Sequence, residues 1–71
     1  MKTLEIVAKD LNKVQEVAGQ YGVVVVSTKL ISKCHLVKLE GTQYALWDFV
    51  DEFYINKPGL AASYTQEILA M

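Results

Sequence analysis

Residues 3–9 alternate between two faces with a period of two. The positions on the apolar side are Leu4, Ile6 and Ala8. This pattern predicts a strand over residues 3–9 with one buried face. Asp10 follows as a candidate N-cap, and apolar residues then recur at helical spacing up to Gly22. We therefore predict a helix over residues 11–21.

The middle of the chain is rich in β-branched residues. Four consecutive valines open a segment that predicts a strand over residues 23–29, and a second extended stretch covers residues 34–40. We expect these strands to pair as a hairpin. The intervening residues 30–33 contain no Gly, Asn or Pro, so the pattern does not specify a tight turn between them.

Helical spacing returns in the last third of the chain. Thr42 is a candidate N-cap for a helix over residues 43–54. A connection with Pro and Gly at residues 56–59 follows, and apolar positions then recur at near-helical spacing over residues 60–71. In the helix over residues 43–54, the apolar positions that would face the core are Ala45, Leu46, Phe49, Val50 and Phe53.

These elements occur in the order βαββα(α), which predicts an α+β fold. Right-handed connections place the helices against a three-stranded antiparallel sheet, and the order resembles a ferredoxin-like fold lacking its last strand. We expect one compact domain over residues 1–71, made of a βαββα unit (1–57) and a C-terminal helix (58–71). Without a fourth strand, the first strand lies at an edge of the sheet.

Composition narrows the chemistry that the chain can support. The single cysteine cannot form an internal disulfide, and Cys34 with His35 cannot complete a zinc shell, so we expect neither metal nor cofactor. Successive side chains on a strand point to opposite faces, which also separates this thiol from this imidazole. No nucleophile, base and orienting group can be assembled, so we do not expect an enzyme.

Charge and hydropathy exclude other classes. No uncharged run reaches the length of about 18 residues that a membrane span needs, and residues 2–5 carry charge where a secretory signal would be apolar. We expect a cytoplasmic protein. Residues 1–40 carry six Lys against four acids, and residues 41–71 carry one Lys against four acids. The absence of Arg and of aromatic residues in the strands argues against nucleic-acid binding.

The first strand, the helix after it and residues 21–24 resemble part of a known family of regulatory domains. The strand ending at residues 6–10, the helix after it and the run Tyr21, Gly22, Val23 and Val24 resemble ACT-type regulatory domains. That resemblance implies a small-molecule-binding module whose ligand lies at the loop between the first strand and the first helix. Residues 10–13 lack the glycine that this family favours in that turn.

The helix over residues 43–54 is apolar over an unusually wide arc of about 200°. Either the C-terminal segment folds back over this flank, or its aromatic residues, bordered by acids, are anchors for another protein. The candidate partner-binding residues are Tyr44, Trp47, Asp48, Asp51, Tyr54 and Tyr64.

The four valines add a second apolar excess, because they leave neither face of their strand polar. Either the third helix covers the far face of the sheet, or two copies associate as a homodimer. The sequence thus predicts a small non-catalytic protein-binding module, an inhibitor or adaptor of a larger protein. The use of Lys without Arg is compatible with a phage origin.

Overall fold

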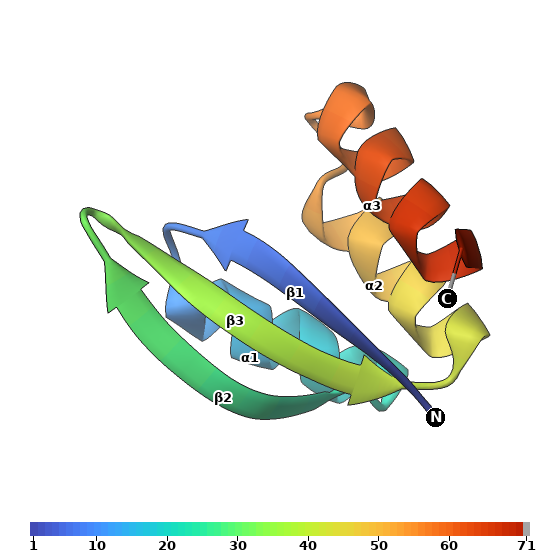
Figure 1. The fold of residues 1–71 in the computed structure, drawn as a ribbon, viewed down its shortest axis with the longest axis horizontal. Helices are drawn as coiled ribbons and strands as arrows, with labels where there is room; N and C mark the ends of the chain where they lie inside the picture. The colour runs from blue at the N-terminus through green and yellow to red at the C-terminus, as the bar shows by residue number, and fades with distance from the viewer. Residues whose placement is uncertain (71) are drawn as a thin grey trace.

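The computed structural model describes residues 1–70 as a three-stranded sheet with three helices. The elements in chain order are β1 (Lys2–Ala8), α1 (Leu11–Tyr21), β2 (Val24–Ile31), β3 (Cys34–Gly41), α2 (Gln43–Phe53) and α3 (Pro58–Ala70) (Figure 1). The predicted α+β class and the order βαββα(α) are confirmed.

The sheet has the strand order β1-β3-β2, and both pairings are antiparallel. Ile6 of β1 lies opposite Val37 of β3, which lies opposite Thr28 of β2 on its other side. The pairing of β2 shifts between Val25 and Ser27, so Val26 is a bulge residue. β3 is therefore central, and β1 lies at an edge as predicted.

Local capping explains where α1 and α2 begin. The carboxylate of Asp10 accepts a hydrogen bond from the backbone N–H of Lys13 at 3.1 Å, and Thr42 Oγ1 accepts one from the N–H of Ala45 at 3.1 Å. α1 ends at Gly22, whose positive φ of 71° costs a residue without a side chain little. The predicted starts of α1 and α2 are confirmed.

α3 begins at Pro58, which is the predicted start of the C-terminal helix (58–71), although its apolar spacing begins only at residue 60 and residues 56–59 read as a connection. Proline fits the first turn of a helix, because its missing N–H would have no partner there and its φ is already helical. The predicted end of this helix at Met71 lies outside the described residues.

The core lies between one face of the sheet and the helices α1 and α2. In Figure 1, α1 lies behind the strands and α2 lies beyond β1, next to α3. Alternate residues of β1 and β3 supply the sheet side of this core, and α1 and α2 supply the other side. No polar or charged residue among residues 1–70 is buried. The fully buried large side chains are Leu4, Ile6, Val14, Val37, Leu39, Leu46, Phe49, Val50 and Ile68.

The opposite face of the sheet, which we call the open face, has no helix over it. Val7, Val24, Val26 and Ile31 are each about half exposed, at 47–54%. α3 lies beside α2 and the outer edge of β1 rather than over the valines of β2 (Figure 1). The expectation that the third helix covers the far face of the sheet is therefore wrong.

The hairpin turn is tighter than residues 30–33 suggest. β2 continues to Ile31, and only Ser32 and Lys33 form the turn. Ser32 has a positive φ of 56°, which two-residue hairpin turns require at their first central position and which glycine adopts best. The twist of the two strands forces this conformation on a residue that disfavours it.

Replacing Ser32 with glycine removes this local strain. We expect Ser32→Gly to raise the free energy of unfolding by about 0.5–1 kcal/mol, measured by chemical denaturation. Lys33→Gly is the matched control, because Lys33 has no positive φ to relieve, and it should not stabilise the protein. A Ser32→Gly variant less stable than the parent would contradict this account of the turn.

Candidate functional site

The six residues predicted to bind a partner do not form one surface. Tyr44, Asp48 and Asp51 are exposed on α2, Tyr44 at 73%, and Trp47 beside them is half-buried. At 100° per residue these four positions share one flank of the helix. The remaining two residues lie elsewhere, so the structure brings together only the part of the predicted site on α2.

Tyr54 and Tyr64 instead lie in the contact between α2 and α3. Tyr54 is only 5% exposed, and its ring stacks on that of Tyr64 with centroids 5.2 Å apart. Phe53 packs edge-on against Tyr54 at 4.9 Å and stacks on Phe49 at 5.4 Å. The C-terminal helix thus covers Tyr54, as one of the two alternatives expected, whereas Trp47, which the same alternative also placed under this helix, stays half-buried.

Both tyrosine hydroxyls bind the outer edge of β1 at a single residue. Tyr54 donates a hydrogen bond to the carbonyl of Val7 at 3.0 Å, and the N–H of Val7 donates one to the hydroxyl of Tyr64 at 3.2 Å. Burial, together with the adjacent hydroxyl of Tyr64, raises the pKa of Tyr54 above the ordinary phenol range. The phenol therefore stays neutral and keeps its donor proton.

A second anchor fixes the C-terminal end of α3 to the start of β1. The ammonium of Lys2 donates to the side-chain oxygen of Gln43 at 2.9 Å and to the backbone carbonyl of Ile68 at 3.0 Å. Ile68 itself is fully buried. α3 is thus held to β1 by its middle, at Val7, and by its C-terminal end, at Lys2, and this edge of the sheet is closed to another strand at Val7.

The outer edge of β2 has no such cover. Antiparallel strands direct the backbone groups of alternate residues toward and away from their neighbour. Since Ile31 and Cys34 pair next to the two-residue turn, Thr28 and Leu30 direct their N–H and C=O groups outward. Within residues 1–70, no hydrogen bond from another element reaches these groups.

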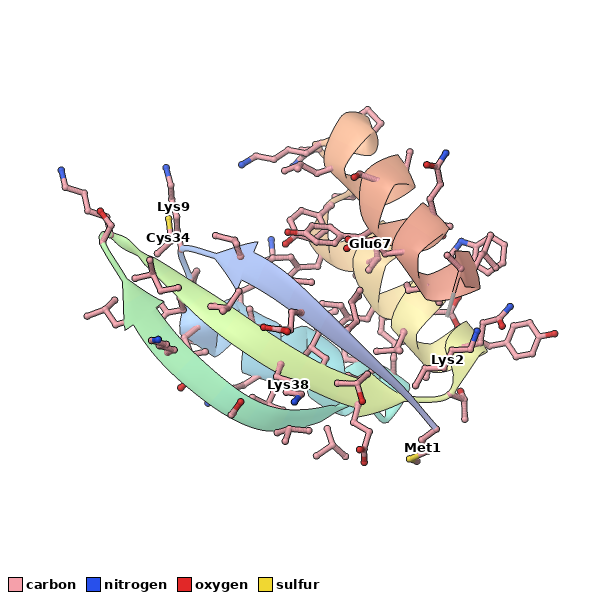
Figure 2. The ribbon with its side chains drawn as sticks, in the orientation of Figure 1. Met1, Lys2, Lys9, Cys34, Lys38 and Glu67 are labelled. Atoms are coloured by element: carbon pink, nitrogen blue, oxygen red, sulfur yellow. The ribbon has the colours of Figure 1, made fainter. Side chains whose placement is uncertain are left out.

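A cavity of about 600 Å³ lies where β1 ends. In Figure 2, Lys9 and Cys34 lie close together at this end of the sheet. The ACT-type resemblance pointed to the loop between β1 and α1, which forms one wall of this cavity. The sequence did not indicate the other walls, because they come from separate segments and no short motif marks them. The lining residues are Val7, Ala8, Lys9, Asp10, Lys13, Cys34, Phe53, Tyr54, Asn56, Lys57, Leu60 and Tyr64.

Cys34 and His35 do not combine into a reactive pair or a metal site. Cys34 and His35 are adjacent on β3 and half-buried, and they pair with Ile31 and Ala8 respectively, on opposite faces. Residues 1–70 contain no group of three or more His, Cys, Asp or Glu side chains arranged to hold a metal ion. In that same part of the chain, no helix combines the length and apolar character needed to cross a bilayer.

Comparison of the chain with protein-family models, with curated proteins and with solved structures found no match.

The hydroxyl of Tyr54 should stabilise the edge contact measurably. We expect Tyr54→Phe to lower the free energy of unfolding by about 1 kcal/mol, because it leaves the Val7 carbonyl without this partner. Tyr44→Phe, at a position 73% exposed, is the control and should change nothing. Equal stability of the Tyr54→Phe variant and its parent in urea denaturation would disprove this role.

The raised pKa of Tyr54 also predicts how stability changes with pH. A phenol with a folded-state pKa above its unfolded value of 10.0 contributes stability that is fully present below pH 10.0 and is lost as pH rises further. We therefore expect the parent to lose more stability than Tyr54→Phe above that pH. Denaturation curves at a series of alkaline pH values test this, and identical losses would refute it.

Proposed function

We propose that this chain is a non-catalytic docking module that binds an extended strand of another protein along the outer edge of β2. The observation that carries the proposal is the difference between the two sheet edges. Tyr54 and Tyr64 occupy the edge of β1 at Val7, whereas the outward groups of β2 are open. An open edge supports β-augmentation, in which main-chain hydrogen bonds provide affinity.

The side chains of β2 indicate the kind of strand that would fit. Seven of its eight residues are exposed, and Val24, Val26, Leu30 and Ile31 present apolar surface at 47–67% exposure. The charged residues of β2 and its turn are Lys29 and Lys33, both cations. The proposed partner strand is therefore apolar and flanked by acidic residues, since like charges opposite each other on paired strands are destabilising.

A second copy of the chain fits this edge less well. Pairing of β2 with β2 would bring Lys29 and Lys33 of both chains to one seam. Stacking of two open faces would also cover little area. Three strands about 4.8 Å apart and about 23 Å long make a face of about 300 Å². In a stable complex each partner buries about 800 Å². The homodimer expected from the sequence is therefore the alternative that the experiment below distinguishes from strand binding.

The exposed flank of α2 is a separate surface. Tyr44, Trp47, Asp48 and Asp51 lie on α2, whose buried residues join the core on the covered face of the sheet. A single strand on the edge of β2 does not reach them. Trp47→Ala therefore distinguishes the two surfaces, because it should leave strand binding unchanged. A module of this kind would act as an adaptor or an inhibitor of the protein that it binds.

Two synthetic peptides test the proposal. One has alternating valine and threonine flanked by Asp and Glu, and the other has the same centre flanked by lysines. Titration by fluorescence anisotropy should show the acid-flanked peptide binding about tenfold more tightly. Leu30→Pro removes one outward N–H that a bound strand would need, so it should abolish binding. The fold should survive, because the N–H of Leu30 makes no hydrogen bond within the sheet.

Thr3→Pro on β1 is the matched control, since Thr3 faces the opposite edge of the sheet, and it should bind as the parent does. Circular dichroism establishes that both proline variants are folded. Unchanged binding by a folded Leu30→Pro variant, or equal affinity for both peptides, would overturn the proposal. Sedimentation as a dimer at micromolar concentration, lost in Leu30→Pro, would instead assign the edge to a second copy.

A further inference from the structure

The cavity at the end of β1 has the size of a small-molecule site. Its volume of about 600 Å³ falls within the range of about 300–1,000 Å³ that is usual for ligand pockets. It is walled by the end of β1, the first turn of α1, the start of β3 and the corner between α2 and α3. It adjoins the edge of β1, so it is separate from the strand-binding edge proposed above.

The rim of this cavity is cationic. Lys9, Lys13 and Lys57 reach it from three different segments, and all three are exposed. Asp10 is the one acid in the lining, and its carboxylate already accepts the N–H of Lys13 as the cap of α1. Three ammonium groups facing one carboxylate leave an excess of positive charge, which attracts an anion.

The interior of the cavity is apolar. Val7, Ala8, Phe53 and Leu60 line it together with the two stacked tyrosines. The hydroxyls of Tyr54 and Tyr64 are engaged with Val7, so these residues offer mainly ring surface. A flat apolar group packs well against such aromatic surface.

We infer that this cavity binds a small organic anion, with a carboxylate or phosphate held by the lysines and a flat apolar group against the aromatic wall. The cation-rich rim and the apolar wall together specify this class, since neither a neutral apolar molecule nor an inorganic anion would use both. The inference does not depend on strand binding, and either can fail without the other.

The single cysteine of the chain reports on occupancy. Cys34 is half-buried and lies in the cavity wall. A molecule in the cavity would shield its thiol from a neutral reagent such as N-ethylmaleimide. Labelling of Cys34, followed by intact-protein mass spectrometry, therefore measures binding directly.

Phenyl phosphate is a suitable probe. Inorganic phosphate is the control for its anionic group, and benzyl alcohol is a neutral aromatic control. We expect phenyl phosphate to bind saturably with a Kd of about a few millimolar. It should slow the labelling of Cys34 and shift the amide resonances of residues 7–13 and 57–60. At the same concentrations, inorganic phosphate and benzyl alcohol should each produce much smaller effects.

Variants locate the charge. Lys9→Gln and Lys57→Gln should each weaken phenyl phosphate binding about two- to fivefold. Lys38→Gln is the matched control, because Lys38 lies on the central strand away from the cavity (Figure 2), and it should not change the Kd. Absence of saturable binding, equal effects from all three variants, or equal binding of benzyl alcohol would overturn the inference.

Discussion

The packing of α3 along the outer edge of β1 is the constraint on which the rest of this structure depends. A sheet of three strands can bury one face under α1 and α2, and one helix then remains. The hydroxyls of Tyr54 and Tyr64 satisfy both backbone groups of Val7, and Lys2 binds the carbonyl of Ile68. The contacts of Tyr64 and Ile68 are made only when α3 lies along β1, so the helix cannot also cover the open face.

Two features follow from this placement. The open face keeps half-exposed valines, and the edge of β2 keeps outward backbone groups, because no further element is available to cover them. At the other side of the sheet, the α2–α3 corner and the end of β1 line an open cavity between them. One helix position thus accounts both for the surface proposed to bind a strand and for the cavity inferred to bind an anion.

Much of the fold was predictable from local patterns. The alternation around Ile6 and the caps Asp10 and Thr42 predicted elements that the structure confirms, because caps and periodicity act within a few residues. The position of α3 was not predictable, since helical spacing does not specify which surface a helix covers. Tyr54 was predicted to bind a partner, because an aromatic residue with a hydroxyl group suits a binding surface as well as a buried contact. Local patterns could not reveal its buried contact, since its hydrogen-bond partner Val7 is 47 residues away.

Amide hydrogen exchange tests this account most directly, because it compares the two sheet edges in one molecule. The account predicts that the N–H of Val7, which Tyr64 accepts, exchanges much more slowly than the outward N–H groups of Thr28 and Leu30. Exchange at Val7 as fast as at Leu30 would show that α3 does not close the edge of β1. Strong protection at Thr28 and Leu30 in the isolated protein would show that the edge of β2 is already occupied.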